Sequence, residues 1–222
     1  MGIKESLAIL SSVFLIICAV VYGLKYVRIQ KNYLLGFEWL IVAFSASNLL
    51  FYLLTGLTVS YNISFFLDAF SRAFGVPIVA TLGLMAVTHN YRPSVTKDII
   101  IFTVSFAATF VMVLANSVKD QLPYFYLFMW TGYSIYLCSF TWQLLRVGES
   151  LHALLNALTT AAALAIAIVY DFFPIPGDSD KMEFIIYALT VWGFQITQQY
   201  YAYGALARAK KHPYQSSVQA YD

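Results

Sequence analysis

The chain has 222 residues, of which 60% are hydrophobic and only 11% are charged. Soluble globular domains carry about 25% charged residues, so this composition excludes a soluble domain, and its high hydrophobicity excludes a disordered chain. The net charge of +2 and the lack of any run of like charges exclude a nucleic-acid partner, so the lipid bilayer is the first partner expected.

Long apolar stretches recur along the chain and predict an all-α integral membrane protein. A helix needs about 20 apolar residues to cross a bilayer, and each stretch has roughly that length. We expect one membrane domain over 1–207, a seven-transmembrane-helix bundle, and a short cytoplasmic tail at 208–222. The expected spans are 6–27, 33–56, 64–89, 98–116, 122–145, 151–173 and 182–207.

The basic residues predict the orientation of this bundle, because loops rich in Lys and Arg stay in the cytoplasm. With the N-terminus outside, nine basic residues fall on the inner side and three on the outer side. The inner nine are Lys25, Arg28, Lys31, Arg92, Lys97, Arg146, Arg208, Lys210 and Lys211, and the outer three are Lys4, Lys119 and Lys181. We therefore expect the N-terminus outside and the C-terminus in the cytoplasm, in a bacterial inner membrane or a eukaryotic membrane.

The second and third expected helices carry polar residues at depths where such groups are costly and usually functional. Glu38 lies about one turn into the second helix, either at the membrane interface or as a candidate general acid. Asn48 belongs to a polar face in the outer half of that helix. Asp68 and Arg72 share one face of the third helix and form either a structural pair or an anion or proton site. Pro77 predicts a kink below them.

Small residues on the sixth expected helix predict a packing face, because they let helices approach closely. Ala163 is expected to lie off this face, whereas Asn156 lies beside it and is expected to look inward. The alanines of the stripe recur at four-residue intervals: Ala153, Ala157, Ala161 and Ala165.

The seventh expected helix carries three glutamines, Gln195, Gln198 and Gln199, whose spacing places them on one face. An amide without a partner in hydrocarbon costs several kcal/mol, so these side chains need partners. Together with Asn156 they predict a polar cavity in the inner half of the bundle. Trp192 lies deep in the same helix, as Trp130 does in the fifth, and each either packs or borders a pocket for a ring-shaped or cationic ligand.

Motifs that carry chemistry are sparse in this chain. The last helix has no lysine at mid-depth, which excludes a photoactive retinal pigment. The histidines and the two cysteines show no metal-ligand spacing, so neither a metal nor a cofactor is expected.

Three classes of function are left by these observations. The leading class is a small-solute transporter or channel-like facilitator, because polar faces of several helices could converge on a path. The second is a ligand-binding sensor or an assembly subunit with a membrane-protein partner. The third is an intramembrane enzyme acting on a lipid or isoprenoid, with Glu38 or Asp68 as a weak candidate acid, although no motif favours an enzyme. The predicted ligand-binding residues are Asn48, Asp68, Arg72, Asn156, Trp192, Gln195, Gln198 and Gln199.

Overall fold

The computed structural model describes residues 2–173, 175–178 and 181–211, and every regular element in these ranges is a helix. Residues 212–222 of the expected tail lie outside the described residues. The long α-helices are α1 (Ile3–Arg28), α2 (Tyr33–Thr55), α5 (Val95–Leu114), α6 (Leu122–Arg146), α7 (Ser150–Phe172) and α8 (Met182–Lys211). Between α2 and α5 lie α3 (Thr58–Phe70), the π-helix η1 (Ser71–Ala80) and α4 (Thr81–Thr88), and a short 3₁₀ helix, η2 (Asn116–Gln121), precedes α6.

Five helices are long and apolar enough to cross a membrane: α1, α2, α5, α7 and the continuous helix Thr58–Thr88 formed by α3, η1 and α4. The chain is therefore all-helical, as predicted, and is compatible with a multi-pass membrane protein. α6 and α8 have 25 and 30 residues but are richer in tyrosine, tryptophan and glutamine.

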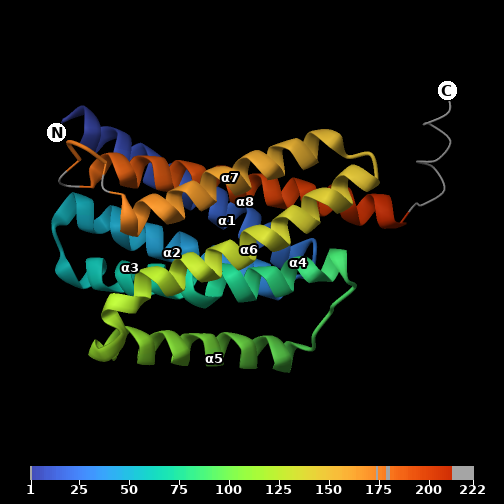
Figure 1. Cartoon of the computed structure of the whole chain (residues 1–222), viewed down its shortest axis with the longest axis horizontal. Coiled ribbons are helices and arrows are strands. Elements are labelled where there is room, and N and C mark those ends of the chain that lie inside the picture. The colour runs from blue at the N-terminus through green and yellow to red at the C-terminus, as the bar shows by residue number, and fades with distance from the viewer. Residues whose placement is uncertain (1, 174, 179–180, 212–222) are drawn as a thin grey trace.

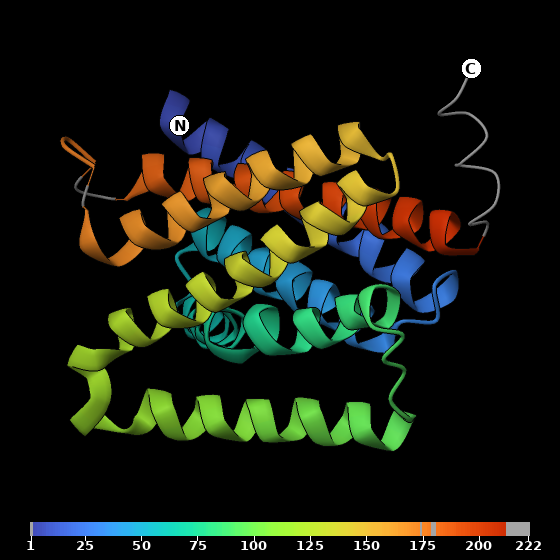
Figure 2. The same cartoon turned by 45° about the vertical axis from the view of Figure 1, so that its right-hand side comes forward.

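The long helices lie side by side and alternate in direction along the molecule (Figure 1). α1 packs against α2 and α8, α2 against α3, η1 against α6, and α7 against both α6 and α8. These contacts close a ring of helices, and α5 lies outside it against α3 and η1 (Figure 2). We call the end where α1 begins and α8 begins the N-terminal end, and the end where α8 finishes the basic end.

The helix limits differ most from the predicted ones at two places, the start of the third helix and the end of the last. The third helix begins at Thr58 instead of 64. Gly56, in the left-handed conformation with φ 71°, is enough to turn the chain from α2 into α3. A polar loop is therefore not needed there. The last helix continues to Lys211 instead of 207, and the basic residues of its last turn suit the negative end of the helix dipole.

The face of α7 that packs into the bundle is not the predicted alanine stripe. Ala157, Ala161 and Ala165 are exposed, whereas Ala163 is 1% exposed. Steps of four residues drift around a helix of 3.6 residues per turn, so a four-residue repeat does not stay on one side. Alternating steps of three and four residues stay on one side of a helix. The buried positions of α7 follow this pattern: Ala153, Asn156, Thr160, Ala163 and Ala167.

Where Pro77 predicts a kink, the third helix is a π-helix, η1, which contains this proline. Proline has no N–H to continue the α-helical ladder, so a wider turn is favoured around it. The Glu38 side chain of α2 lies against Gly75 of η1, where an added Cβ would collide with its carboxyl group. π-helical segments are rare and often occur at functional sites.

Candidate functional site

A cavity of about 590 Å³ lies inside the ring of helices and extends from its N-terminal end. Its wall runs on α2 from Leu53 down to Trp39 and on α8 from Met182 down to Ile196. At 1.5 Å per residue each of these stretches covers about 20 Å, which is roughly two-thirds of a bilayer core. Most of the wall is apolar or aromatic.

Packed side chains separate the cavity from the basic end of the bundle. Tyr26 of α1, Leu35 of α2 and Leu206 of α8 are fully buried members of one hydrophobic cluster in this region. At the same end, the Asn32 side chain donates a hydrogen bond to the Gly83 carbonyl of α4 at 2.7 Å. The cavity is thus connected to one end of the bundle and ends inside it.

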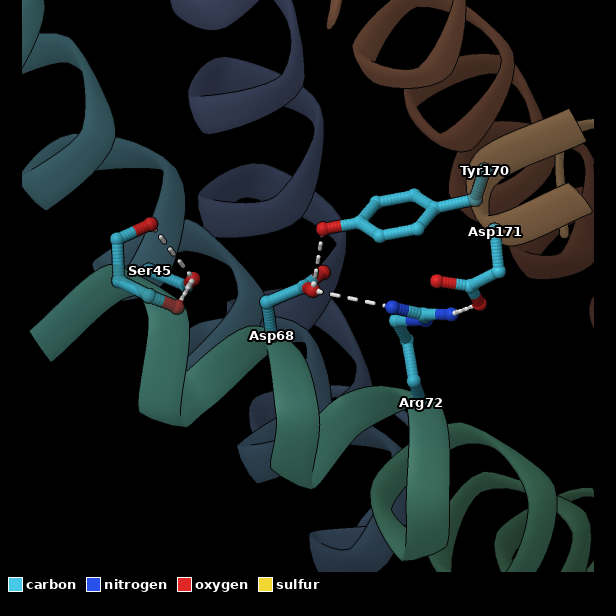
Figure 3. A network of polar contacts seen from close by, with 6 residues as sticks. Ser45, Asp68, Arg72, Tyr170 and Asp171 are labelled. Atoms are coloured by element: carbon cyan, nitrogen blue, oxygen red, sulfur yellow. Dashed lines mark hydrogen bonds and ion pairs between the residues drawn. The ribbon is translucent and has the colours of Figure 1, made fainter. Parts of the chain in front are cut away.

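Arg72 lies in the outer part of the cavity wall, and its charge is already compensated. The guanidinium forms an ion pair with Asp171 of α7, and its Nη1 lies 3.9 Å from the Oδ2 of Asp68 (Figure 3). The ring centroids of Tyr126 and Tyr170 lie 4.1 and 3.8 Å from its Cζ, so an aromatic ring of α6 and one of α7 contact it. Tyr170 also donates to Asp68 at 3.3 Å. One cation therefore connects the third helix to α6 and α7.

The deeper part of the cavity wall includes Trp39, Trp130, Trp192 and Gln195. The indole N–H groups of the three tryptophans and the side-chain nitrogen of Gln195 are buried and have no hydrogen-bond partner among the described residues. Most buried polar groups in proteins are hydrogen-bonded, so these four atoms are exceptions. The side chains line the cavity, but their unpaired nitrogen atoms do not face it.

The serine hydroxyls of the wall already have partners. Ser45 of α2 donates to the backbone carbonyl of Ser64 on α3 at 3.1 Å (Figure 3). Ser71 donates to Oε1 of Glu38 at 2.9 Å. Glu38 is 0% exposed and lies between α2 and η1. The glycine at position 75 and the wide turns of η1 leave room for its carboxyl group between the helices.

Four of the eight predicted ligand-binding residues line the cavity: Asp68, Arg72, Trp192 and Gln195. Asn48 does not, since its amide donates to the Phe44 carbonyl of its own helix at 2.9 Å. Asn156 is buried between α7 and α6 and donates to the Thr141 hydroxyl at 2.9 Å.

Two of the three glutamines on α8 connect helices rather than line the cavity. Gln198 donates to the His152 carbonyl of α7 at 3.0 Å, and Gln199 donates to the Tyr133 hydroxyl of α6. Gln195 alone of the three belongs to the cavity wall. Two of the glutamines therefore bond to other helices and one lines the cavity, because residues three and four apart on a helix point in directions that differ by tens of degrees.

Sequence reasoning missed Asp171, Tyr170 and Trp39 as residues of the site. Asp171 carries a signal in hindsight, because it is an acidic residue inside the expected span 151–173. The tryptophans carry another, since three of the four in the chain line one cavity.

No group of three or more His, Cys, Asp or Glu side chains in the described part of the chain is placed to hold a metal ion. Comparison with known protein families, curated proteins and solved structures finds no match for this chain. The cavity and its lining residues are therefore the features from which a function can be inferred.

Proposed function

We propose that the chain is a seven-helix membrane protein that binds a small molecule in the cavity between its helices. α6 and α8 support seven spans, because both belong to the ring that also contains four of the five apolar helices. Their lengths of 25 and 30 residues correspond to about 37 and 45 Å, more than the roughly 30 Å of a bilayer core.

The size and lining of the cavity are the observation that carries this proposal. Ligand pockets typically measure about 300–1,000 Å³ and are mostly apolar, with a few polar groups that orient the ligand. The cavity measures about 590 Å³, and its wall is mostly apolar and aromatic with a few polar residues, among them Ser45, Ser71 and Gln195. Of the classes predicted from sequence, a ligand-binding protein such as a sensor agrees best with a cavity that ends inside the bundle.

Transport of a small solute is a second proposal, which one feature of the third helix favours. Ser71, Arg72 and Val76 of η1 lie in the cavity wall, and Pro77 follows them. A proline-containing π-helix is a place where a membrane helix can bend, so a movement there could open the packed region toward the basic end. Uptake of the bound molecule into proteoliposomes would distinguish a transporter from a binding protein.

Native mass spectrometry of the protein purified from its own membrane tests the binding proposal. We expect a small molecule on the wild-type protein and its loss in Ala188→Trp or Ala46→Phe, because both positions line the cavity. Ala165→Trp, on the exposed face of α7, should retain it. A wild-type protein without any bound molecule, or binding that survives in both cavity variants, would contradict the proposal.

A further inference from the structure

We infer that the cavity binds an organic amine in its protonated form, with the ammonium group beside Asp68 and an apolar body deeper among the tryptophans. This inference rests on the proposed binding function and names the chemistry of the ligand. It follows from three properties of the wall: a carboxylate with an unpaired oxygen, a buried cation that a ligand cannot reach, and a deep part made of carbon surface.

Asp68 offers the cavity a carboxylate oxygen. Its contacts with the Tyr170 hydroxyl at 3.3 Å and with Arg72 at 3.9 Å both use Oδ2 (Figure 3). Oδ1 has no partner among the described residues, yet it is not one of the fully buried polar atoms. Asp68 lines the cavity, and 24% of its side-chain surface is exposed. A carboxylate oxygen can only accept hydrogen bonds, so Oδ1 requires a donor from a ligand.

The group of charges around Arg72 has room for one more cation. The Arg72 side chain is only 7% exposed, is ion-paired with Asp171 and is contacted by the rings of Tyr126 and Tyr170, so an anionic ligand cannot reach its guanidinium. Two carboxylates share this one guanidinium, which leaves one negative charge uncompensated. A charge without a partner is costly inside a membrane, so a cationic ligand is favoured at Asp68.

The surroundings of Asp68 favour an ammonium group over other cations. Lys181 is the other cation among the described wall residues, but it is exposed at the cavity mouth, where water and salt screen its charge. A metal ion such as Mg²⁺ or Ca²⁺ requires several oxygen ligands. Phe65 and Tyr61 precede Asp68 in the wall by three and seven residues, so aromatic rings share its helix face. Such rings attract an ammonium group through their faces.

The deeper wall suits the apolar body of such an amine. Trp39, Trp130 and Trp192 line the cavity, but their indole nitrogens are buried away from it, so they present carbon surface to a ligand. Val42 and Leu189 are further apolar residues of this wall. Moving apolar surface from water into such surroundings is favourable. The expected ligand is therefore charged at one end and apolar at the other.

Three probes of the same shape separate recognition of the charge from apolar binding. 4-Phenylbutylamine, 4-phenylbutanol and 4-phenylbutyrate have the same ring and carbon chain, but they end in a cation, a neutral hydroxyl and an anion. We expect the amine to bind at least about tenfold more tightly than the other two, the factor typical of one hydrogen bond to a charged group. Equilibrium dialysis of the full-length protein in detergent against protein-free micelles measures the three dissociation constants and corrects for partitioning.

Variants then test whether Asp68 recognises the ammonium group. Asp68→Asn should weaken amine binding about tenfold and change alcohol binding by less than about twofold. The ion pair of Arg72 with Asp171 remains in this variant, so we expect it to fold, and its alcohol binding reports that the cavity is intact. Asp120→Asn is the matched control, because Asp120 is exposed on η2 and does not line the cavity. Ala188→Trp, which fills the cavity, should abolish binding of both probes.

The outcomes distinguish this inference from the proposed binding function. Equal affinity for the amine and the alcohol, tighter binding of 4-phenylbutyrate, or amine binding unchanged in Asp68→Asn would overturn the inference while the cavity still binds a ligand. Amine binding that survives in Ala188→Trp would place the amine outside the cavity and overturn the inference as well. Failure of all three probes, with a molecule other than an amine found on the purified protein, would overturn the inference alone. Failure of the probes together with an unliganded purified protein would overturn both.

Discussion

At the scale of single residues, Arg72 holds three helices together at the outer part of the cavity. Its predicted partner, Asp68, lies one turn away on the same helix, but Asp171 of α7 forms the ion pair that crosses the bundle. Two carboxylates face one guanidinium, so removing the cation leaves two acidic groups close together in a partly buried place. A buried pair broken from one side leaves a charge without compensation.

Arg72→Gln is therefore expected to destabilise the protein by about 3–5 kcal/mol, the typical cost of breaking a buried pair from one side. Adding Asp171→Asn should restore more stability than adding Asp68→Asn. Asp68 keeps the Tyr170 hydroxyl as a donor after Arg72 is removed, whereas Asp171 loses its ion pair across the bundle. Thermal unfolding of the three variants in detergent measures the order, and equal rescue by the two substitutions would show that the pair within the third helix is as important.

At the scale of elements, the shape of η1 is coupled to the carboxyl group of Glu38. The absence of a side chain at Gly75 lets that carboxyl lie against the π-helix, where Ser71 donates to it. The Glu38 carboxyl group thus packs together with the π-helical turns that contain Pro77, next to the inner end of the cavity.

Gly75→Ala should lower the free energy of unfolding by about 1–3 kcal/mol, because the added methyl group collides with Glu38 and overpacking has this typical cost. Glu38→Ala in the same chain should remove the collision, so the two effects should not add. Gly132→Ala is the control: a Cβ at this α6 position meets no atom within 4 Å, and alanine favours a helix over glycine. Chemical unfolding monitored by tryptophan fluorescence measures the wild type, the three single variants and the double variant. A harmless Gly75→Ala would contradict the close approach.

The sequence predicted the elements well and their inward faces poorly. Apolar length is a local property, so the helices could be found from the chain alone. In a membrane protein the packed face and the lipid face are both apolar, and the alanine pattern of α7 therefore indicated the wrong side. Asp171 and Trp39 depended on which helices become neighbours. Contacts between segments about a hundred residues apart, such as that of Arg72 with Asp171, leave no spacing signal in a single sequence.

At the scale of the whole molecule, the proposed orientation determines which side of the membrane can supply the ligand. The basic residues that end α1, α6 and α8 lie at the end of the bundle away from the cavity mouth. Lys210 also joins two helices there, since its ammonium donates to the Val87 carbonyl at 2.9 Å and to Oε1 of Gln143 at 2.9 Å. If positive loops stay in the cytoplasm, the cavity opens to the outside.

Cysteine labelling in intact cells tests this orientation. With Cys18 and Cys138 replaced by serine, Lys119→Cys on η2 should react with a membrane-impermeant maleimide added outside, because Lys119 is exposed at the N-terminal end. Ser150→Cys, exposed at the start of α7 at the basic end, should react only after the cells are permeabilised. The reverse pattern would place the cavity mouth in the cytoplasm, and the ligand would then have to come from inside the cell. Labelling of both positions from outside would contradict the placement of the two ends on opposite sides of a membrane.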